Sequence, residues 1–106
     1  MTTLTLETEP TLAVSAKQRA HQVSMTEENL IVALVDGRSL SIPLAWYPRL
    51  QHATPQEQQN WELLGDGYAI EWADLDEHIG VEGLLAGRRS GESQKSFERW
   101  LASRHQ

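Results

Sequence analysis

Five carboxylates and one imidazole lie close together in residues 69–87, AIEWADLDEHIGVEGLLAG: Glu71, Asp74, Asp76, Glu77, Glu82 and His78. Groups of these types can bind a divalent cation through oxygen and nitrogen ligands. They can also transfer protons when burial or a like charge shifts the pKa of one carboxyl group. The third alternative is an acidic loop that faces water or a partner.

The spacing of these residues matches no metal-binding template. Asp74 and His78 are four positions apart, as two ligands on a helix would be, but the strand-like AIEW and Gly80 argue against a helix there. A calcium loop needs glycine at its sixth position, counted from Asp74, and Ile79 stands there. A zinc site would need further histidine or cysteine ligands at a set spacing, and the remaining histidines are scattered.

We therefore predict that this stretch contains no metal ligand, no cofactor-binding residue and no catalytic residue. A metal-binding or acid–base site centred on residues 74–78 is the alternative. For a structural role, we expect Asp76 or Glu77 to cap the helix that carries VEGLL. A carboxylate at a helix N-terminus gains about 0.3–1 kcal/mol from the helix dipole.

Charge is distributed unevenly along the chain. The net charge is −6, yet residues 1–87 carry thirteen acidic and four basic side chains, whereas residues 88–106 carry five basic and two acidic ones. Nucleic-acid affinity depends mainly on neutralising phosphates, so the acidic part argues against a nucleic-acid partner for the main domain. The basic tail could contact nucleic acid, or dock on the acidic body of its own or a neighbouring chain.

Length and composition predict a single cytoplasmic domain. A chain of 106 residues with 40% apolar content can bury one modest core. It has no cysteine, which excludes disulfides, thiolate metal sites and a thiol nucleophile. No apolar run approaches the roughly 20 residues of a membrane span, and MTTLTLETEP lacks the pattern of a signal peptide.

The first half of the domain predicts strands. HQVSMT alternates apolar and polar residues, LIVALV is an apolar run of strand length, and RSLSIPL places Leu40, Ile42 and Leu44 on one face. Asp36-Gly37 between the last two runs is a hairpin signal, because a type I′ turn needs positive φ. We expect a three-stranded antiparallel meander.

The second half predicts further strands and short helices. WELLGDGYAIEW reads as two strands around its GDG turn, with Tyr68, Ile70 and Trp72 on one face. TPQEQQNW has a helix-start pattern, with Thr54 as N-cap, followed by proline and then glutamate at the third helical position. In WYPRLQHA, Pro48 is compatible with a helix only within the first turn. The predicted fold is α+β: an antiparallel sheet that begins with the meander, and short helices packed on one face.

The chain divides into three parts. Residues 1–19 form an N-terminal arm that we expect to be disordered, residues 20–87 form the α+β domain, and residues 88–106 form a basic hinge and a C-terminal amphipathic helix. The apolar stripe of this helix, Phe97, Trp100 and Leu101, is too large to stay undocked in water. It should dock in cis, or in trans to give a homodimer.

Nine residues are candidate contacts with a partner. Tyrosine, tryptophan and arginine dominate interface hot spots, which directs attention to WYPR, although we expect Trp46 in the core and Tyr47 half-exposed at a helix start. The acidic loop and the basic tail supply the others. The candidates are Tyr47, Arg49, Asp74, Asp76, Glu77, Arg88, Arg89, Phe97 and Trp100.

Four segments in order, DGR…IPLAWYPRL, ATPQEQQNW, GYAIEWADLDE and VEGLLAG, resemble the domain of unknown function 2442, a family of small bacterial proteins. The resemblance covers residues 20–87 and implies a compact α+β fold. The family has no established enzymatic activity, so it assigns no catalytic residue. Some members lie beside or are fused to small DNA-binding or toxin-like domains, which implies an antitoxin-like or regulatory role. This chain shows no appended helix-turn-helix.

The favoured hypothesis is a non-enzymatic interaction module that binds a protein partner and self-associates. The first alternative is the small metal-binding or acid–base enzyme centred on residues 74–78. The second is nucleic-acid binding through the basic side chains of the tail, Arg88, Arg89, Lys95, Arg99 and Arg104.

Overall fold

Residues 18–104 are described by the computed structural model of the chain, so most of the predicted N-terminal arm lies outside the described residues. The fold is α+β, as predicted, and within residues 18–104 six strands form two separate antiparallel sheets. The first sheet contains β2 (Ala20–Met25), β3 (Asn29–Leu34) and β4 (Ser39–Pro43), and this is the predicted meander. The second contains β5 (Glu62–Leu64), β6 (Ala69–Trp72) and β7 (Glu77–Gly80).

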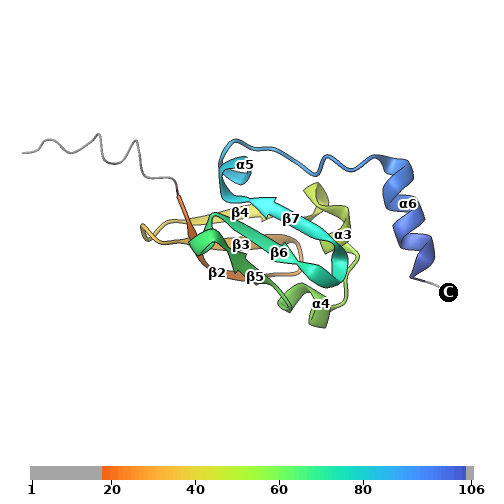
Figure 1. Ribbon diagram of the computed structural model, residues 1–106, viewed down its shortest axis with the longest axis horizontal. Coiled ribbons are helices and arrows are strands. Elements are labelled where there is room, and N and C mark those ends of the chain that lie inside the picture. The colour runs from red at the N-terminus through yellow and green to blue at the C-terminus, as the bar shows by residue number, and fades with distance from the viewer. Residues whose placement is uncertain (1–17, 105–106) are drawn as a thin grey trace, which may run out of the picture.

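Short helices connect and flank the sheets. They are α3 (Pro48–Gln51), α4 (Pro55–Gln59) and α5 (Val81–Leu85), with 3₁₀ turns at η1 (Leu44–Trp46), η2 (Gly65–Gly67) and η3 (Ala73–Leu75). The C-terminal helix α6 (Gln94–Ser103) lies beyond one end of the sheets, at the end of an extended segment (Figure 1). Within residues 18–104, no helix is long and apolar enough to cross a membrane.

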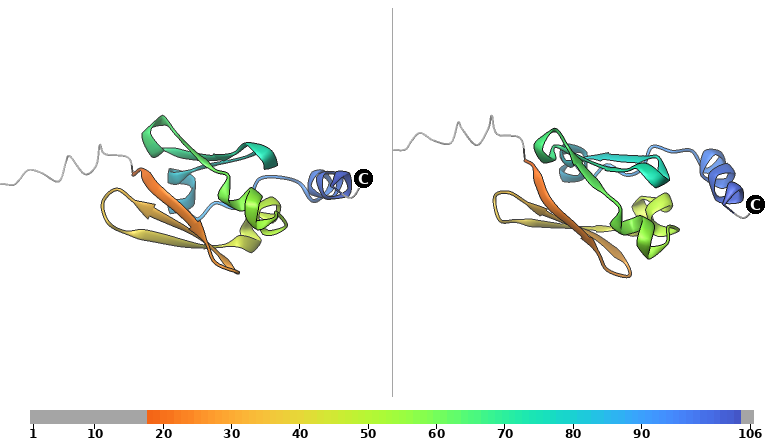
Figure 2. Two further views of the ribbon diagram at one scale, coloured as in Figure 1. Left: turned by 90° about the horizontal axis from the view of Figure 1, so that it is seen from below. Right: turned by 60° about the horizontal axis from the view of Figure 1, so that its bottom comes forward.

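The core lies between the two sheets, which face each other in Figure 2. Burial alternates along β3 and along β6, so each strand directs one set of side chains inward. Trp72 is fully buried, and its indole N–H donates a 2.9 Å hydrogen bond to the Gln58 carbonyl oxygen of α4. Among the described residues no polar or charged residue is buried, and the core is held by apolar packing.

The hairpin between β3 and β4 forms at the predicted place, but the predicted type I′ turn is wrong. Gly37 has a positive φ of 97°, whereas Asp36 does not. The Gly37 N–H donates to the Leu34 carbonyl oxygen, and the Leu34 N–H donates to the Arg38 carbonyl oxygen. The chain therefore uses a three-residue loop with glycine in the left-handed position, the next most common way to join two strands.

The turn before β6 depends on glycine. Gly67 has a φ of 100°, and a Cβ placed there would lie 2.1 Å from the Ala20 carbonyl oxygen, so η2 can approach β2 only without a side chain. Tyr68 follows this turn and is exposed, while Ile70 and Trp72 are buried. The prediction that all three share one face is wrong for Tyr68, because the strand begins at Ala69.

The ends of α3 and α4 follow the predicted patterns. Pro48 is the first residue of α3, where the missing N–H has no helical partner to lose. At α4, the Thr54 hydroxyl accepts a hydrogen bond from the Glu57 N–H, and the Glu57 carboxylate accepts one from the Thr54 N–H. This is the predicted capping box.

The acidic stretch contains more regular structure than expected. Residues 77–80 form strand β7, so the helix N-cap is Gly80 and no side chain caps the helix. The prediction that Asp76 or Glu77 caps this helix is therefore wrong. The helix does end as its sequence suggests: Gly87 has a φ of 79°, and the Gly87 and Arg88 N–H groups donate to the Leu84 and Gly83 carbonyl oxygens.

Candidate functional site

Arg49 joins the body of the domain to its C-terminal arm, residues 88–104. The helix α3 places its guanidinium where Nε and Nη2 donate to the Glu92 carboxylate at 3.0 and 2.6 Å, and Nη1 donates to the Leu75 carbonyl oxygen at 2.8 Å. Its Cζ atom also lies 5.2 Å from the centre of the Trp100 ring, within the range of a cation–π contact. The Arg49 and Glu92 side chains are only 15% and 14% exposed, so water screens this pair less than a surface pair.

Tyr47 supports the same junction from inside. Its ring is 4% exposed, and its hydroxyl donates a 2.7 Å hydrogen bond to the Arg88 carbonyl oxygen. Burial raises the pKa of this hydroxyl, with a smaller contribution from the Glu77 carboxylate. The prediction of a half-exposed Tyr47 is therefore wrong, and its side chain is not on the surface in this arrangement.

Trp46, the residue before Tyr47, is less buried than predicted. Trp46 ends the 3₁₀ turn η1 and packs only partly against the core, and the Arg89 guanidinium lies 4.5 Å above its ring. The non-helical backbone at Tyr47 (φ −131°, ψ 81°), which precedes Pro48, separates this turn from α3 and changes which side chain faces inward. The prediction that Trp46 lies in the core is therefore only partly right, because its side chain is half-buried against the core.

A shallow pocket of about 300 Å³ opens between β7 and the arm. Glu77 lies in it at the first position of β7, opposite Trp72 in the strand register. The pKa of Glu77 is raised to about 7, mainly by desolvation; Arg49 acts to lower it, and the Glu92 and Asp76 carboxylates act to raise it. The pocket is lined by Arg49, Asp76, Glu77, His78, Ser90, Gly91 and Glu92. We call this set of residues the arm junction.

Arg49 cannot fully compensate the Glu77 charge because it is already engaged with another carboxylate. The pKa of Glu92 is lowered by its hydrogen bonds with Arg49, and the hydroxyl of Ser96 donates a further bond of 2.7 Å to Glu92. Asp76, in the left-handed region at φ 52°, ends the turn before β7 and brings a third carboxylate to the same pocket. One guanidinium thus faces three carboxylates.

The arm docks in cis on the body in this structure. The Ser90 N–H donates to the Trp46 carbonyl oxygen, and Ser93 caps α6 by accepting a hydrogen bond from the Ser96 N–H. Phe97 is the one buried residue of α6, and its ring centre lies 5.2 Å from that of His52. At the far end of α6, Arg104 pairs with Glu57 at 2.6 Å and lowers the pKa of that carboxyl group.

Three of the nine predicted contact residues, Arg49, Asp76 and Glu77, belong to the arm junction. Tyr47, Arg88, Phe97 and Trp100 take part in other contacts of the docked arm, and two residues lie apart from it. Asp74 accepts a 2.7 Å hydrogen bond from the Asn60 amide, on the side of α4, and Arg89 stacks on Trp46. His78 is exposed and pairs in register with Glu71 on β6. Within residues 18–104, no three histidine, aspartate or glutamate side chains are arranged to hold a metal ion.

Sequence reasoning missed Glu92, His52, and the pairing of Glu57 with Arg104. Glu92 stands 43 positions after Arg49, and Arg104 stands 47 positions after Glu57. No local pattern specifies such pairs. The one available signal was that Glu92 immediately precedes a serine N-cap, which places it at the start of a helix that must dock somewhere.

Comparison with known proteins supports the fold and gives no activity. A search of the curated proteins found no match. A crystal structure of a protein of unknown function from Rhodospirillum rubrum is 26% identical, with a TM-score of 0.63, over 74% of this chain and 98% of that one. A solution structure of an uncharacterized protein from Chromobacterium violaceum is 23% identical, with a TM-score of 0.61, over 98% and 96% of the two chains, and shows likeness of fold.

The family assignment depends on the sequence match, which extends beyond the four motifs noted above. The model of the family described as "Protein of unknown function (DUF2442)" matches residues 20–90. This range begins with β2 and ends at Ser90, so it includes both sheets, Arg49, the acidic stretch and the start of the arm. The chain belongs to the DUF2442 family.

Proposed function

We propose that this chain is a non-enzymatic interaction module that binds a protein partner through its C-terminal arm and the surface that the arm covers. The observation that carries this proposal is the Arg49 clasp. One side chain joins α3, the Leu75 carbonyl oxygen, the Glu92 carboxylate and the Trp100 ring. The arm thus depends on a few polar contacts and one buried ring.

Such an attachment is well suited to exchange. A helix of ten residues is marginal in water on its own, so α6 owes its order to the surface on which it docks. A partner that offers a better surface for Phe97 and Trp100 could displace the body from α6. The partner would then also gain access to Arg49 and His52.

The charges of the body and the arm indicate which surface charges the proposed partner should have. The body is acidic and the arm is basic, with Arg88, Arg89, Lys95 and Arg99 exposed along the arm. A partner with both a basic and an acidic surface would be steered to the junction by these opposite potentials. A second copy of the chain meets this requirement, because exchanged arms would make the same Arg49–Glu92 contact between two protomers. The family resemblance adds an antitoxin-like or regulatory role to the proposal, and the composition of the chain, which has no cysteine, favours a cytoplasmic setting.

Affinity purification of the full-length chain from its native host tests the proposal. We expect the wild-type chain to recover one protein in stoichiometric amount, or to form a dimer by light scattering. Arg49→Glu should change that recovery or the dimer fraction at least fivefold. Arg38→Glu is the matched control, because within residues 18–104 the salt-bridge partner of Arg38 is Asp36, at an exposed turn.

Two results would contradict the proposal. One is a chain that is monomeric at all concentrations and recovers no stoichiometric partner. The other is a partner or dimer that Arg49→Glu and Arg38→Glu affect equally, since this would place the interface away from the clasp.

A second function is supported by one observation, the environment of Glu77. A carboxyl group with a pKa of about 7 in an open pocket can donate or accept a proton near neutral pH. Turnover of a small substrate that is lost in Glu77→Gln and kept in Glu71→Gln would favour acid–base chemistry over the interaction module. Glu71 is a suitable control because it is a carboxylate of the same acidic stretch on the adjacent strand.

A further inference from the structure

The outer edge of β2 offers backbone hydrogen-bonding groups to a further strand. Among residues 18–104, β2 is at the edge of its sheet and pairs with β3 alone. The Thr26 N–H donates to Asn29 of β3, and backbone direction alternates along an antiparallel strand. Thr26 and Ser24 therefore direct their backbone groups toward β3, while Val23 and Met25 direct theirs away from the sheet. No described residue accepts from or donates to these outward groups.

The two edges of this sheet differ in protection. β4 ends in Pro43, and proline is one of the devices that discourage pairing along an edge. The strand AHQVSM contains no proline, lysine or carboxylate. The first part of β2 is protected by a register shift between Ala20 and Gln22 and by the close approach of Gly67. Within the described part of the chain, none of the common protective devices covers the second part, from Val23 to Met25.

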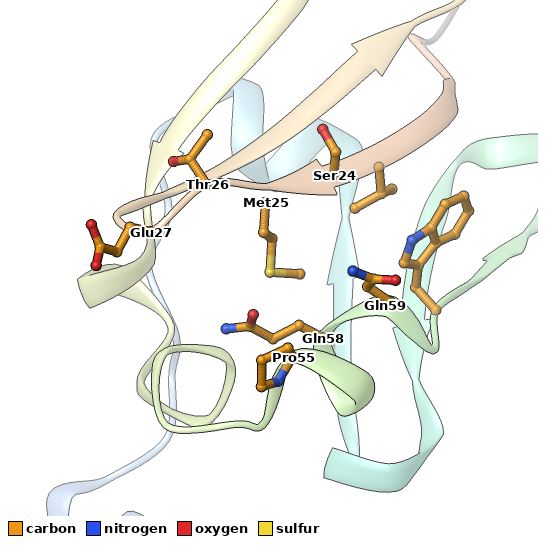
Figure 3. Close-up of a pocket in the computed structure, with 9 residues that line it drawn as sticks. Ser24, Met25, Thr26, Glu27, Pro55, Gln58 and Gln59 are labelled. Carbon is orange, nitrogen blue, oxygen red and sulfur yellow. The ribbon is translucent and has the colours of Figure 1, made fainter.

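A groove lies beside this open part of the edge. It has a volume of about 530 Å³ and separates β2 from α4 and Trp61. Figure 3 shows Met25 pointing across it toward Gln58 and Gln59, with Glu27 at one end. The Gln58 amide is engaged with the Leu50 carbonyl oxygen, whereas the Gln59 amide makes no hydrogen bond with another described residue. We call this feature the β2 groove.

We infer that the β2 groove binds an extended segment of a partner protein, which adds to β2 as a further antiparallel or parallel strand and carries a basic residue beside Glu27. Main-chain bonds to Val23 and Met25 would supply affinity, as in other cases of strand addition. The Met25 and Trp61 side chains would receive an apolar side chain of the segment. Glu27 is the single charged residue among the nine that line the groove, in an acidic body, so charge complementarity selects lysine or arginine.

This inference uses different residues from the arm junction and does not depend on it. The groove involves β2, the turn after it and one side of α4, whereas the clasp involves α3, β7 and the arm. A chain could therefore bind one segment at the groove while its arm stays docked.

Selection from a phage-displayed library of random ten-residue peptides on the full-length chain tests the inference. We expect selected peptides to alternate apolar and polar residues and to contain lysine or arginine near one end. Binding of a labelled peptide, followed by fluorescence anisotropy, should weaken at least tenfold in Met25→Pro. This substitution removes an outward N–H and leaves the β2–β3 hydrogen bonds intact. Ser41→Pro is the matched control, since it also removes an outward N–H, on the opposite edge strand β4.

Amide hydrogen exchange on the unsubstituted chain gives a readout that does not depend on whether the proline variants fold. The selected peptide should slow exchange at Val23 and Met25. Failure to select any peptide, or binding that leaves exchange at these two amides unchanged, would overturn the inference. Slow exchange at these two amides without peptide would also overturn the inference. If exchange were slow at every protein concentration, the edge would be assigned to residues 1–17. If it were slow only at high protein concentration, the edge would be assigned to a second copy of the chain.

Discussion

The core between the sheets and the arm junction are held by contacts of opposite character. The core is made of fully buried apolar side chains, and the Trp72 N–H is satisfied by a carbonyl oxygen. The arm is held by two arginine–glutamate pairs, a tyrosine hydroxyl and one buried phenylalanine. Apolar packing responds weakly to salt and pH, while charged contacts respond strongly. The difference suggests a body that remains folded under conditions in which its arm is released.

The largest expected effect separates the two regions by stability. Replacing Trp72 by alanine should reduce the free energy of unfolding by about 3–5 kcal/mol, because it leaves a cavity in the core and removes the hydrogen bond to the Gln58 carbonyl oxygen of α4. Urea denaturation followed by circular dichroism measures this loss. Val35→Ala, at an exposed apolar residue, should change it by less than about 0.5 kcal/mol. Comparable losses in both variants would mean that the core is not where the structure places it.

A second effect belongs to the body but acts through backbone geometry. Gly67→Ala should cost about 2 kcal/mol or more, since its Cβ would meet the Ala20 carbonyl oxygen at 2.1 Å with φ at 100°. The melting temperature should fall accordingly in a thermal scan. Gly91→Ala in the arm is the comparison, because open space surrounds that position. An equal melting temperature for Gly67→Ala and the wild type would show that η2 and β2 are further apart than described.

The features that the sequence predicted correctly depend on residues a few positions apart. The capping box at α4 requires only Thr54 and Glu57, and the end of α5 requires only Gly87, so both are visible in a short window. Strand β7 was missed because EHIG is short and ends in glycine, which has a low strand propensity. The elements on either side of it, β6 and α5, have patterns that are recognisable in the sequence.

The arm junction could not be assembled from the sequence for a physical reason. The exchange of roles between Trp46 and Tyr47 results from one 3₁₀ turn, which shifts the inward direction by a single residue. The Arg49–Glu92 pair joins residues that only the tertiary fold brings together. Composition indicated the charges and the apolar stripe of α6, and only packing decides which of them meet.

A third effect should be local to the arm. Arg49→Ala removes charge-assisted hydrogen bonds to Glu92 and the bond to the Leu75 carbonyl oxygen. We expect the free energy that holds the arm on the body to fall by about 1–2 kcal/mol. Proteolytic cleavage in residues 88–93 should become faster, with the sheets still folded. Limited proteolysis followed by mass spectrometry locates the cut. Arg38→Ala should leave both quantities unchanged, because its pair with Asp36 is exposed.

If Arg49→Ala unfolded the whole chain in one transition, the comparison between body and arm would fail. The same conclusion would follow if high salt left cleavage in residues 88–93 unchanged, since a charged clasp should weaken as salt screens it.

A further effect distinguishes, by pH, Glu77 in the arm junction from Glu92 and Glu57, the carboxylates that pair with Arg49 and Arg104. Glu77 has a pKa of about 7 in the folded chain against an ordinary value of 4.5, so the folded state holds its proton more tightly than the unfolded state. Between pH 4.5 and 7 the folded state therefore binds more protons, and this group's contribution to stability falls as pH rises. Glu77→Gln should remove that decline. The free energy of unfolding of the variant should therefore rise relative to that of the wild type from pH 4.5 to 7, and the difference between the two should stay constant above pH 7.5.

The clasp carboxylates act in the opposite direction and in a separate pH range. The lowered pKa values of Glu92 and Glu57 mean that their contribution is present above pH 4.5 and is lost as pH falls further. Proteolysis of the arm should therefore accelerate below pH 4.5, in the wild type and in Glu77→Gln alike. Urea denaturation between pH 4 and 8 separates the two contributions. A stability difference between Glu77→Gln and the wild type that does not change with pH would show that Glu77 titrates normally and that the junction is more open to water than its geometry implies.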